Sequence, residues 1–179
     1  AVFESTLNPE TRKSEAMHYT SLENIHKVID PLFLDDLKSE LYQIKSIRAK
    51  KTRNHKLHEF QEKIANLKFL DPACGSGNFL TETYLSLRRL ENEMISIYYD
   101  GHRMFNLGDP IKVSIENFYG IEINDFAVSV AATALWIAES QMWHETENLI
   151  QFDGEFLPLK TNNNIHNNNA FDIDWNDVV

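Results

Sequence analysis

A short segment near the middle of this 179-residue chain constrains its fold more than any other. The apolar run that begins at Leu67 ends in an acid, Asp71, and Pro72 and two glycines then interrupt it. From Asn78 onwards apolar residues recur with the period of a helix. The segment therefore predicts a strand, a tight turn and a helix. In an open parallel sheet such a turn lies beyond the carboxyl end of the strand, where ligands bind.

The two glycines of the turn indicate a ligand-binding loop. Gly75 and Gly77 have no Cβ atom, so the backbone can adopt unusual dihedral angles and a ligand can approach closely. Amide groups at the start of the next helix would then face the bound molecule. Because a bare Gly-x-Gly occurs in many turns that bind nothing, the prediction rests on the longer string from Asp71 to Phe79.

The segment from Phe118 to Ile123 predicts a second strand, with Glu122 at its carboxyl end. A carboxylate there can accept hydrogen bonds from both hydroxyl groups of a ribose. In a dinucleotide-binding fingerprint the acid follows the glycine loop by about 20 residues, and Glu122 lies much farther than that from Asp71. This separation disfavours a nicotinamide-dependent oxidoreductase.

Helices are predicted around the two strands. Periodic apolar residues indicate helices from Ser21 to about Lys45 with a kink at Pro31, from Leu57 to Leu67, from Asn78 to the loop at 98–111, and from Asp125, as the cap, to about Trp143. Residues 152–159 are interpreted as a loop or a short strand. The alternation of helices and strands predicts an α/β sheet preceded by helices.

Composition and charge restrict the class of protein. The chain is 42% hydrophobic and 25% charged, as in soluble globular proteins, and has a length that suits one core. It shows no apolar run of the roughly 18–20 residues that a membrane span needs, and residues 1–8 do not resemble a secretory signal. No membrane partner is therefore expected, and the single cysteine favours a reducing cytoplasm. Because the chain has a net charge of −10, we expect most of the affinity for any DNA partner to come from sequence outside this chain.

The string Asp-Pro-Ala-Cys-Gly-Ser-Gly-Asn-Phe-Leu, which starts at Asp71, resembles motif I of the amino-methylating DNA methyltransferases. It is especially similar to the large fused restriction-modification enzymes of type IIG. The resemblance implies a partial Rossmann-like class I S-adenosylmethionine-dependent methyltransferase fold with N-terminal helices. The implied activity is that of a site-specific DNA adenine N6-methyltransferase, with S-adenosylmethionine as cofactor.

The resemblance also assigns cofactor-binding residues. The loop that holds the methionine end of the donor comprises Asp71, Pro72, Ala73, Gly75, Gly77, Asn78 and Phe79. Glu122 and Ile123 correspond to motif II, with Ile123 beside the adenine ring of the donor.

Two further segments resemble motifs X and III of the family. The segment Met17–Ser21 resembles motif X, which closes over the methionine carboxylate and would contribute His18, Tyr19 and Thr20. By composition alone it is a helix cap, with Thr20 or Ser21 supplying the oxygen. The segment from Asn168 to Trp175 resembles motif III, in which an Asn or Asp binds the adenine amino group. Asn169, followed by Ala170, takes that place, although the run of asparagines leaves the register open.

The resemblance divides the chain into two parts. Residues 1–66 form an N-terminal helical segment with motif X, and residues 67–179 form a partial methyltransferase domain with motifs I to III. The catalytic motif IV, Asn/Asp-Pro-Pro-Phe/Tyr, is not in the chain, since no two prolines are adjacent. We expect motif IV beyond residue 179, so this fragment contains no catalytic residue and transfers no methyl group by itself. Duplex DNA is the expected partner of the full-length protein.

Other interpretations stay open on the sequence alone. A protein-glutamine or RNA N-methyltransferase uses the same Asn-Pro-Pro-aromatic site, and an NAD-dependent oxidoreductase or a non-catalytic cofactor-binding module belongs to another class. His55 and His58 share a helix face, but a zinc site needs more ligands than these two, so no metal is expected. Cys74, the only cysteine, is expected to be a small packed residue. The basic stretch from Lys45 to Lys56 is interpreted as a solvated face, with contact to DNA phosphates as a hypothesis.

Overall fold

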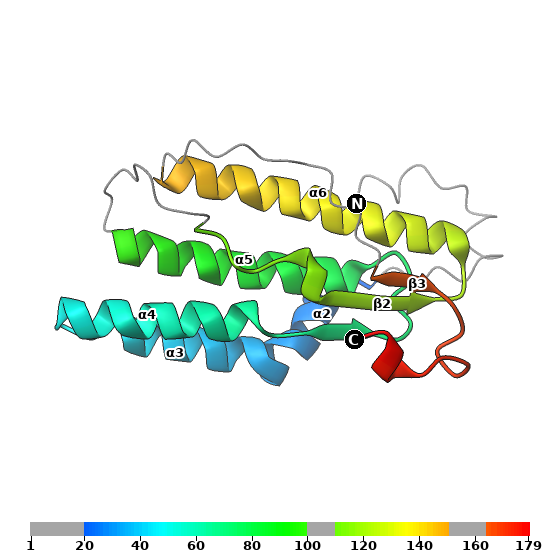
Figure 1. Cartoon of the computed structure of the whole chain (residues 1–179), viewed down its shortest axis with the longest axis horizontal. Helices are drawn as coiled ribbons and strands as arrows, with labels where there is room; N and C mark the ends of the chain where they lie inside the picture. Colours follow the sequence, from blue (N-terminus) through cyan, green and yellow to red (C-terminus); the bar gives the residue numbers. More distant parts are fainter. Residues whose placement is uncertain (1–19, 100–109, 151–163) are drawn as a thin grey trace.

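A computed structural model of the chain describes residues 20–99, 110–150 and 164–179, in which helices pack around a small sheet (Figure 1). The elements in chain order are α2 (Leu22–Ile29), the π-helical turn η1 (Asp30–Leu34), α3 (Asp35–Lys45), α4 (Lys50–Ala65), β1 (Phe69–Asp71), α5 (Asn78–Tyr99), the 3-10 turn η2 (Ile115–Asn117), β2 (Phe118–Glu122), α6 (Asp125–Ile150), β3 (Ile165–Asn167) and the 3-10 turn η3 (Trp175–Asp177). Within these ranges, every helix is too short or too polar to traverse a bilayer.

The three strands form one parallel sheet in the order β1-β2-β3. Asp71 pairs with Gly120, and Glu122 pairs with Asn167, so the carboxyl ends of all three strands lie at one edge. The two predicted strands are confirmed with slightly shorter bounds. The third strand, Ile165–Asn167, lies in the asparagine-rich segment and was not predicted.

Two long helices cover the sheet on one side. α5 packs against β1 and β2, α6 packs against β2 and β3, and the two helices lie against each other (Figure 1). A row of aromatic rings joins these layers, with ring centroids 5.1 Å apart for Phe33 and Phe69, 5.2 Å for Phe69 and Phe118, and 5.4 Å for Phe118 and Tyr84. Such pairs stabilise beyond the area they bury. The row therefore links η1, the two strands β1 and β2, and α5.

The N-terminal helices belong to the same core as the sheet. Ile25 of α2, Leu41 of α3 and Leu57 of α4 are buried in one cluster with Leu87 of α5. Helices on both sides of residue 66 thus share one hydrophobic core. The division of the chain at that residue stays a prediction.

Several predicted boundaries differ from the observed ones. The helical run continues through Pro31, because η1 widens one turn instead of ending the helix. α4 starts at Lys50, earlier than predicted, and α5 continues through Tyr99 into the predicted loop. α6 extends to Ile150 because its buried face continues beyond Trp143. Residues 152–159 lie outside the described part.

The predicted cap of α6 is also wrong by one residue. The side chain of Asn124 caps the helix, since its Oδ1 accepts the Ala127 N–H at 3.0 Å, whereas Asp125 is already the first helical residue. An acid in the first turn still favours the helix through its dipole. At α2 the cap is Ser21, one of the two predicted residues.

A buried polar network lies between α4, α5 and α6. Arg88 and Glu91 of α5 form an ion pair with exposed fractions of 1% and 0%. Glu91 also accepts a hydrogen bond from Gln61 Nε2 at 2.8 Å and from the Lys112 N–H at 2.7 Å. Arg88 donates to Thr146 Oγ1 at 2.8 Å. The network links three helices to the segment that leads into β2.

Candidate functional site

The loop after β1 is held to the next strand by backbone and side-chain hydrogen bonds. The Ala73 N–H donates to Asp71 Oδ1 at 3.0 Å, and the Cys74 N–H donates to the carbonyl of Ile121 at 3.1 Å. The Gly77 N–H then donates to the carbonyl of Cys74 at 2.8 Å, which leads into α5. The loop is therefore a fixed structure at the carboxyl edge of the sheet.

The two glycines of the loop are required for different reasons. Both have positive φ angles, 53° for Gly75 and 78° for Gly77, which L side chains rarely adopt. A Cβ atom on Gly77 would lie 2.9 Å from the Cβ of Ala131, so this glycine allows α5 and α6 to pack closely. A Cβ atom on Gly75 would meet nothing within 4 Å. Gly75 thus borders open space, which suits the close approach of a ligand.

Glu122 lies directly beside this loop. Its Oε2 accepts the Gly75 N–H at 2.9 Å, and its Oε1 accepts the Asn124 N–H at 2.9 Å. Asp71 and Glu122, which are far apart in sequence, therefore end neighbouring strands at one edge. Each carboxylate oxygen of Glu122 retains a further acceptor position for another donor.

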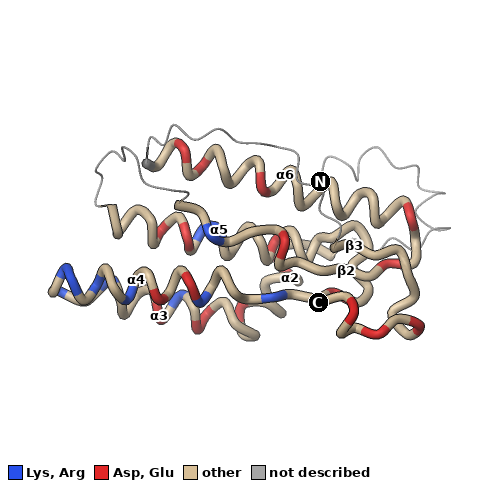
Figure 2. The backbone as a smooth tube through the Cα atoms, viewed as in Figure 1, with Lys and Arg blue, Asp and Glu red and all other residues tan. Residues whose placement is uncertain are grey.

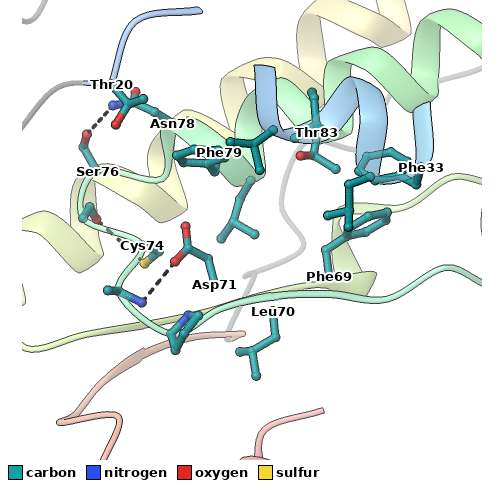
Figure 3. A pocket seen from close by; sticks show the side chains of 17 residues that line it. Thr20, Phe33, Phe69, Leu70, Asp71, Cys74, Ser76, Asn78, Phe79 and Thr83 are labelled. Carbon is teal, nitrogen blue, oxygen red and sulfur yellow. Dashed lines mark hydrogen bonds between the residues drawn. The ribbon is translucent and has the colours of Figure 1, made fainter. Parts of the chain in front are cut away.

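A cavity of about 380 Å³ opens between the loop, η1 and the start of α5 (Figure 3). Seven of the predicted cofactor-binding residues line it: Thr20, Asp71, Pro72, Ala73, Gly75, Asn78 and Phe79. Gly77, Glu122, Ile123, Asn169 and Ala170 do not line it, and His18 and Tyr19 lie outside the described residues. Its size is in the range of small-molecule sites.

The cavity has a polar end and an apolar end. Thr20, Ser76 and Asn78 gather at one end, and Phe33 and Phe69 pack together at the other (Figure 3). The sequence predicted that Leu32 and Phe33 lie on a helix face, but it did not predict that they line a cavity. The missed lining residues are Val28, Ile29, Leu32, Phe33, Phe69, Leu70, Cys74, Ser76, Leu80 and Thr83.

The residues predicted to contact the adenine of the donor, Ile123 and Asn169, lie outside the cavity. Ile123 is 72% exposed at the carboxyl edge of the sheet. Asn169 follows β3 in a tight turn, where its Oδ1 accepts the Phe171 N–H at 3.1 Å. Asn167, which the sequence had not singled out, donates through Nδ2 to the carbonyls of Glu122 and Ile123 at 3.2 Å and 3.0 Å. This side chain ties the asparagine-rich segment to the end of β2.

Two acidic groups at the site have raised pKa values. Burial raises the pKa of the Asp71 carboxyl and the nearby charge of Glu122 adds to this, while the Ala73 N–H opposes it. Burial raises the pKa of the Cys74 thiol to about 12. Cys74 is therefore a packed thiol, as predicted, because a nucleophilic cysteine needs a lowered pKa. Its Sγ occupies the space that a Cβ on Gly120 would need.

The residues considered as zinc ligands pair along α4 instead. His55 Nε2 lies 3.5 Å from Glu59 Oε1, and His58 Nε2 lies 3.8 Å from Glu62 Oε1. Within the described ranges, no three His, Cys, Asp or Glu side chains converge on a point that could hold a metal ion.

A charged cluster joins the two walls of the cavity. His26 of α2 contacts Asp30 through Nδ1 at 3.0 Å and Glu82 of α5 through Nε2 at 3.1 Å. Arg89 also contacts Glu82 at 3.1 Å, and Lys38 contacts Asp30 at 3.4 Å. The His26 side chain is about one-third exposed. The cluster connects the helix that leads into η1 with the helix that follows the glycine loop.

This cluster predicts a pH dependence of stability. Hydrogen bonding to Asp30, and then to Glu82, raises the pKa of His26 above its ordinary value of 6.5, and partial burial opposes this only in part. A raised folded-state pKa means that the stabilisation is complete below about pH 6.5 and is lost as the pH rises through the folded-state value. We expect the free energy of unfolding to fall by about 0.2–1 kcal/mol from about pH 6 to about pH 9.

Urea denaturation across this range measures the effect. In His26→Gln the contribution of this residue to the pH dependence should disappear. His144→Gln on the exposed face of α6 is the matched control and should keep the wild-type profile. Identical profiles for wild type and His26→Gln would contradict the assignment.

Comparison with known proteins places the chain in a family. The family described as the MmeI DNA-methyltransferase domain matches residues 47–179. The chain belongs to this family. DNA methyltransferase A of Bacillus subtilis is 40% identical to it over 182 residues, which cover 99% of this chain and 20% of that protein. The adenine-specific methyltransferase PglX of Streptomyces coelicolor is 28% identical over 139 residues, which cover 64% of this chain and 11% of that protein.

A solved structure agrees with the family assignment. The type IIL restriction-modification enzyme MmeI, solved in complex with DNA, superposes with a TM-score of 0.85 and is 38% identical. The match covers 99% of this chain and 23% of the MmeI chain. The chain thus spans about a quarter or less of the length of these similar proteins.

Proposed function

We propose that this chain is the S-adenosylmethionine-binding part of a site-specific DNA methyltransferase that methylates adenine at N6 in duplex DNA, as part of a restriction-modification enzyme. The observation that supports this best is the open space over Gly75, directly beside the Glu122 carboxylate. Membership of the MmeI methyltransferase family and the adenine-specific relative support the reaction type.

We further propose that the sheet is part of a Rossmann-like class I methyltransferase fold. The parallel order β1-β2-β3, with the candidate site at the carboxyl ends of the strands, supports this assignment. In this proposal residues 1–66 form the helical segment with motif X, and residues 67–179 form the methyltransferase part with motifs I to III. Because no two prolines are adjacent in the chain, it contributes no motif IV in this proposal.

The residues of the site fit the chemical groups of S-adenosylmethionine. The Asp71 carboxyl group lies at the cavity and complements the ammonium group of the methionine end, and Thr20 stands at the polar end of the same cavity. Gly75 leaves room for the backbone of the donor. The Glu122 carboxylate retains acceptor positions for the ribose hydroxyls, and exposed Ile123 offers an apolar surface to the adenine ring.

In this proposal the chain contributes to the reaction by binding and orienting the methyl donor. When bound, the donor supplies an electrophilic methyl group on its sulfonium. The residues of this chain orient the two ends of the donor. The nucleophile in this proposal is the target adenine, and Cys74, a packed thiol with a raised pKa, does not take that role. Fixed geometry of this kind lowers the barrier without a covalent enzyme intermediate. The target adenine has to leave the DNA helix to reach the methyl group.

Calorimetric titration and thermal unfolding with S-adenosylmethionine test the proposal. We expect the methyl donor, but not NAD, to release heat and to raise the melting temperature, because a ligand that binds only the native state stabilises it. The variant Gly75→Ala should remain folded, since its Cβ meets nothing, but should bind the donor at least tenfold more weakly, or about 1.4 kcal/mol. A folded wild-type protein that shows no heat with the donor would refute the proposed function.

The variant Gly77→Ala provides a comparison within the same loop. Its positive φ and its contact with Ala131 predict a loss of stability of about 1–3 kcal/mol, measured by urea denaturation. Gly75→Ala should lose less stability because only the φ angle is strained. Equal losses of stability in both variants would contradict the different roles of the two glycines.

A further inference from the structure

The charges on the hairpin of α3 and α4 are separated along its length (Figure 2). Four cations gather where the two helices meet, and we call them the basic tip: Arg48, Lys50, Lys51 and Arg53. Acidic residues lie towards the other ends of the same helices: Asp35, Asp36, Glu40, Glu59 and Glu62. The tip is a concentrated positive surface on a chain with a net charge of −10.

The cations of the basic tip are only partly engaged within the fold. The flanking Lys45 and Lys56 pair with Glu93 at 3.1 Å and Glu59 at 2.6 Å. Arg48 and Lys51, in contrast, are exposed, and neither forms an ion pair with another residue of the described ranges. The Nε of Arg53 is buried and has no hydrogen-bond partner in the same ranges. Arg48 and Lys51 therefore retain exposed donors that a negatively charged partner can use.

The position of these cations is unfavourable for the helix itself. Lys50, Lys51 and Arg53 lie in the first turn of α4, which contains no acid, and Ala49 provides no side-chain cap. A cation at the positive end of a helix dipole costs about 0.3–1 kcal/mol. Acidic residues in the first turn of α4 would stabilise the helix. The basic residues found there instead indicate a role in binding an anion.

The distance between the basic tip and the glycine loop suits duplex DNA. α4 leads from the tip into β1, whose end carries the loop (Figure 1). With a rise of about 1.5 Å per helical residue and about 3.3 Å per extended residue, the separation is roughly 40 Å. One turn of B-DNA spans about 34–36 Å. A duplex that runs alongside α4 from the loop would pass the tip about one turn away.

We propose that the basic tip binds backbone phosphates of the DNA substrate about one helical turn from the target adenine. This inference rests on the proposed function, because it takes the methylated duplex as the partner. Lysine and arginine contacts to phosphates carry no sequence information and strengthen binding to all sequences alike. The tip positions the duplex and does not recognise its sequence.

The salt dependence of DNA binding by the full-length protein tests this proposal. The variant Arg48→Ala with Lys51→Ala removes two exposed cations, and Lys27→Ala with Lys63→Ala removes two others that are 64% and 52% exposed outside the tip. Each released phosphate contact changes the slope of log Kobs against log salt by about 0.9. With a long linear duplex, the tip variant should therefore lose about two units of slope and the control should lose none.

A second duplex sharpens the test. With DNA shorter than about 10 base pairs, which cannot reach from the loop to the tip, wild type and both variants should give the same slope. A tip variant that binds long DNA with the wild-type slope would overturn the proposal. If the melting temperature of that variant also falls, the partner of the basic tip is an acidic surface of the protein itself. Wild-type binding of duplex and donor would leave the proposed function standing in that case.

Discussion

Glu122→Ala is expected to weaken S-adenosylmethionine binding by about a hundredfold to about twenty-thousandfold. The proposed partners of this carboxylate are the two ribose hydroxyls, and a hydrogen bond to a charged group contributes about 1.5–3 kcal/mol. Two such bonds correspond to about 3–6 kcal/mol in binding free energy, and every 1.4 kcal/mol is a factor of ten. Calorimetric titration of the folded variant with the methyl donor measures the loss.

Two further variants separate this effect from a disturbance of the fold. Glu122→Gln keeps one acceptor oxygen and should fall between wild type and alanine. Glu145→Ala removes an exposed carboxylate on α6, far along the helix from the site, and should bind the donor as wild type does. Because Glu122 also accepts the Gly75 and Asn124 amides, the circular dichroism and melting temperature of each variant must be measured. Unchanged affinity in a folded Glu122→Ala protein would rule out the ribose contact.

Glu91→Ala is expected to destabilise the fold by about 3–5 kcal/mol. The substitution leaves Arg88, which is 1% exposed, as a buried charge without its partner carboxylate. It also removes the acceptor for the Gln61 amide and the Lys112 N–H. The free energy of unfolding from urea denaturation measures the loss, which is a large fraction of the stability of a typical domain.

A double variant tests whether the loss comes from the unpaired charge. Arg88→Met combined with Glu91→Leu replaces the ion pair by apolar side chains and should be more stable than Glu91→Ala alone. The exposed pair of Lys27 and Glu23 is the control, because Glu23→Ala should change stability by less than about 1 kcal/mol. A Glu91→Ala protein within about 1 kcal/mol of wild type would contradict the expected cost of the unpaired buried charge.

The strand, turn and helix around the glycine loop could be predicted because their signals are local. Apolar residues before Asp71, the two glycines and the periodic residues after Asn78 each follow from backbone sterics or helix geometry. The contact between Gly75 and Glu122 could be expected only from the rule that parallel strands end at one edge. The distance of 2.9 Å between them agrees with that expectation.

The third strand and the apolar end of the cavity could not be predicted, because they depend on partners distant in sequence. Ile165–Asn167 contains little that favours a strand, and pairing with β2 and the Asn167 side chain hold it in place. The periodicity around Pro31 indicated a helix face but not the π-helical turn that directs Leu32 and Phe33 to the cavity. Local patterns do not determine where packed helices leave a gap.

The hydrogen bonds of Glu122 affect the kinetics of ligand binding. The carboxylate connects the loop after β1 to the start of α6 through two backbone amides before any ligand is present. Much of the entropy of ordering this loop is thus lost during folding and not during association. Because the loop is already ordered when a ligand binds, we expect strong and weak ligands to differ more in their dissociation rates than in their association rates.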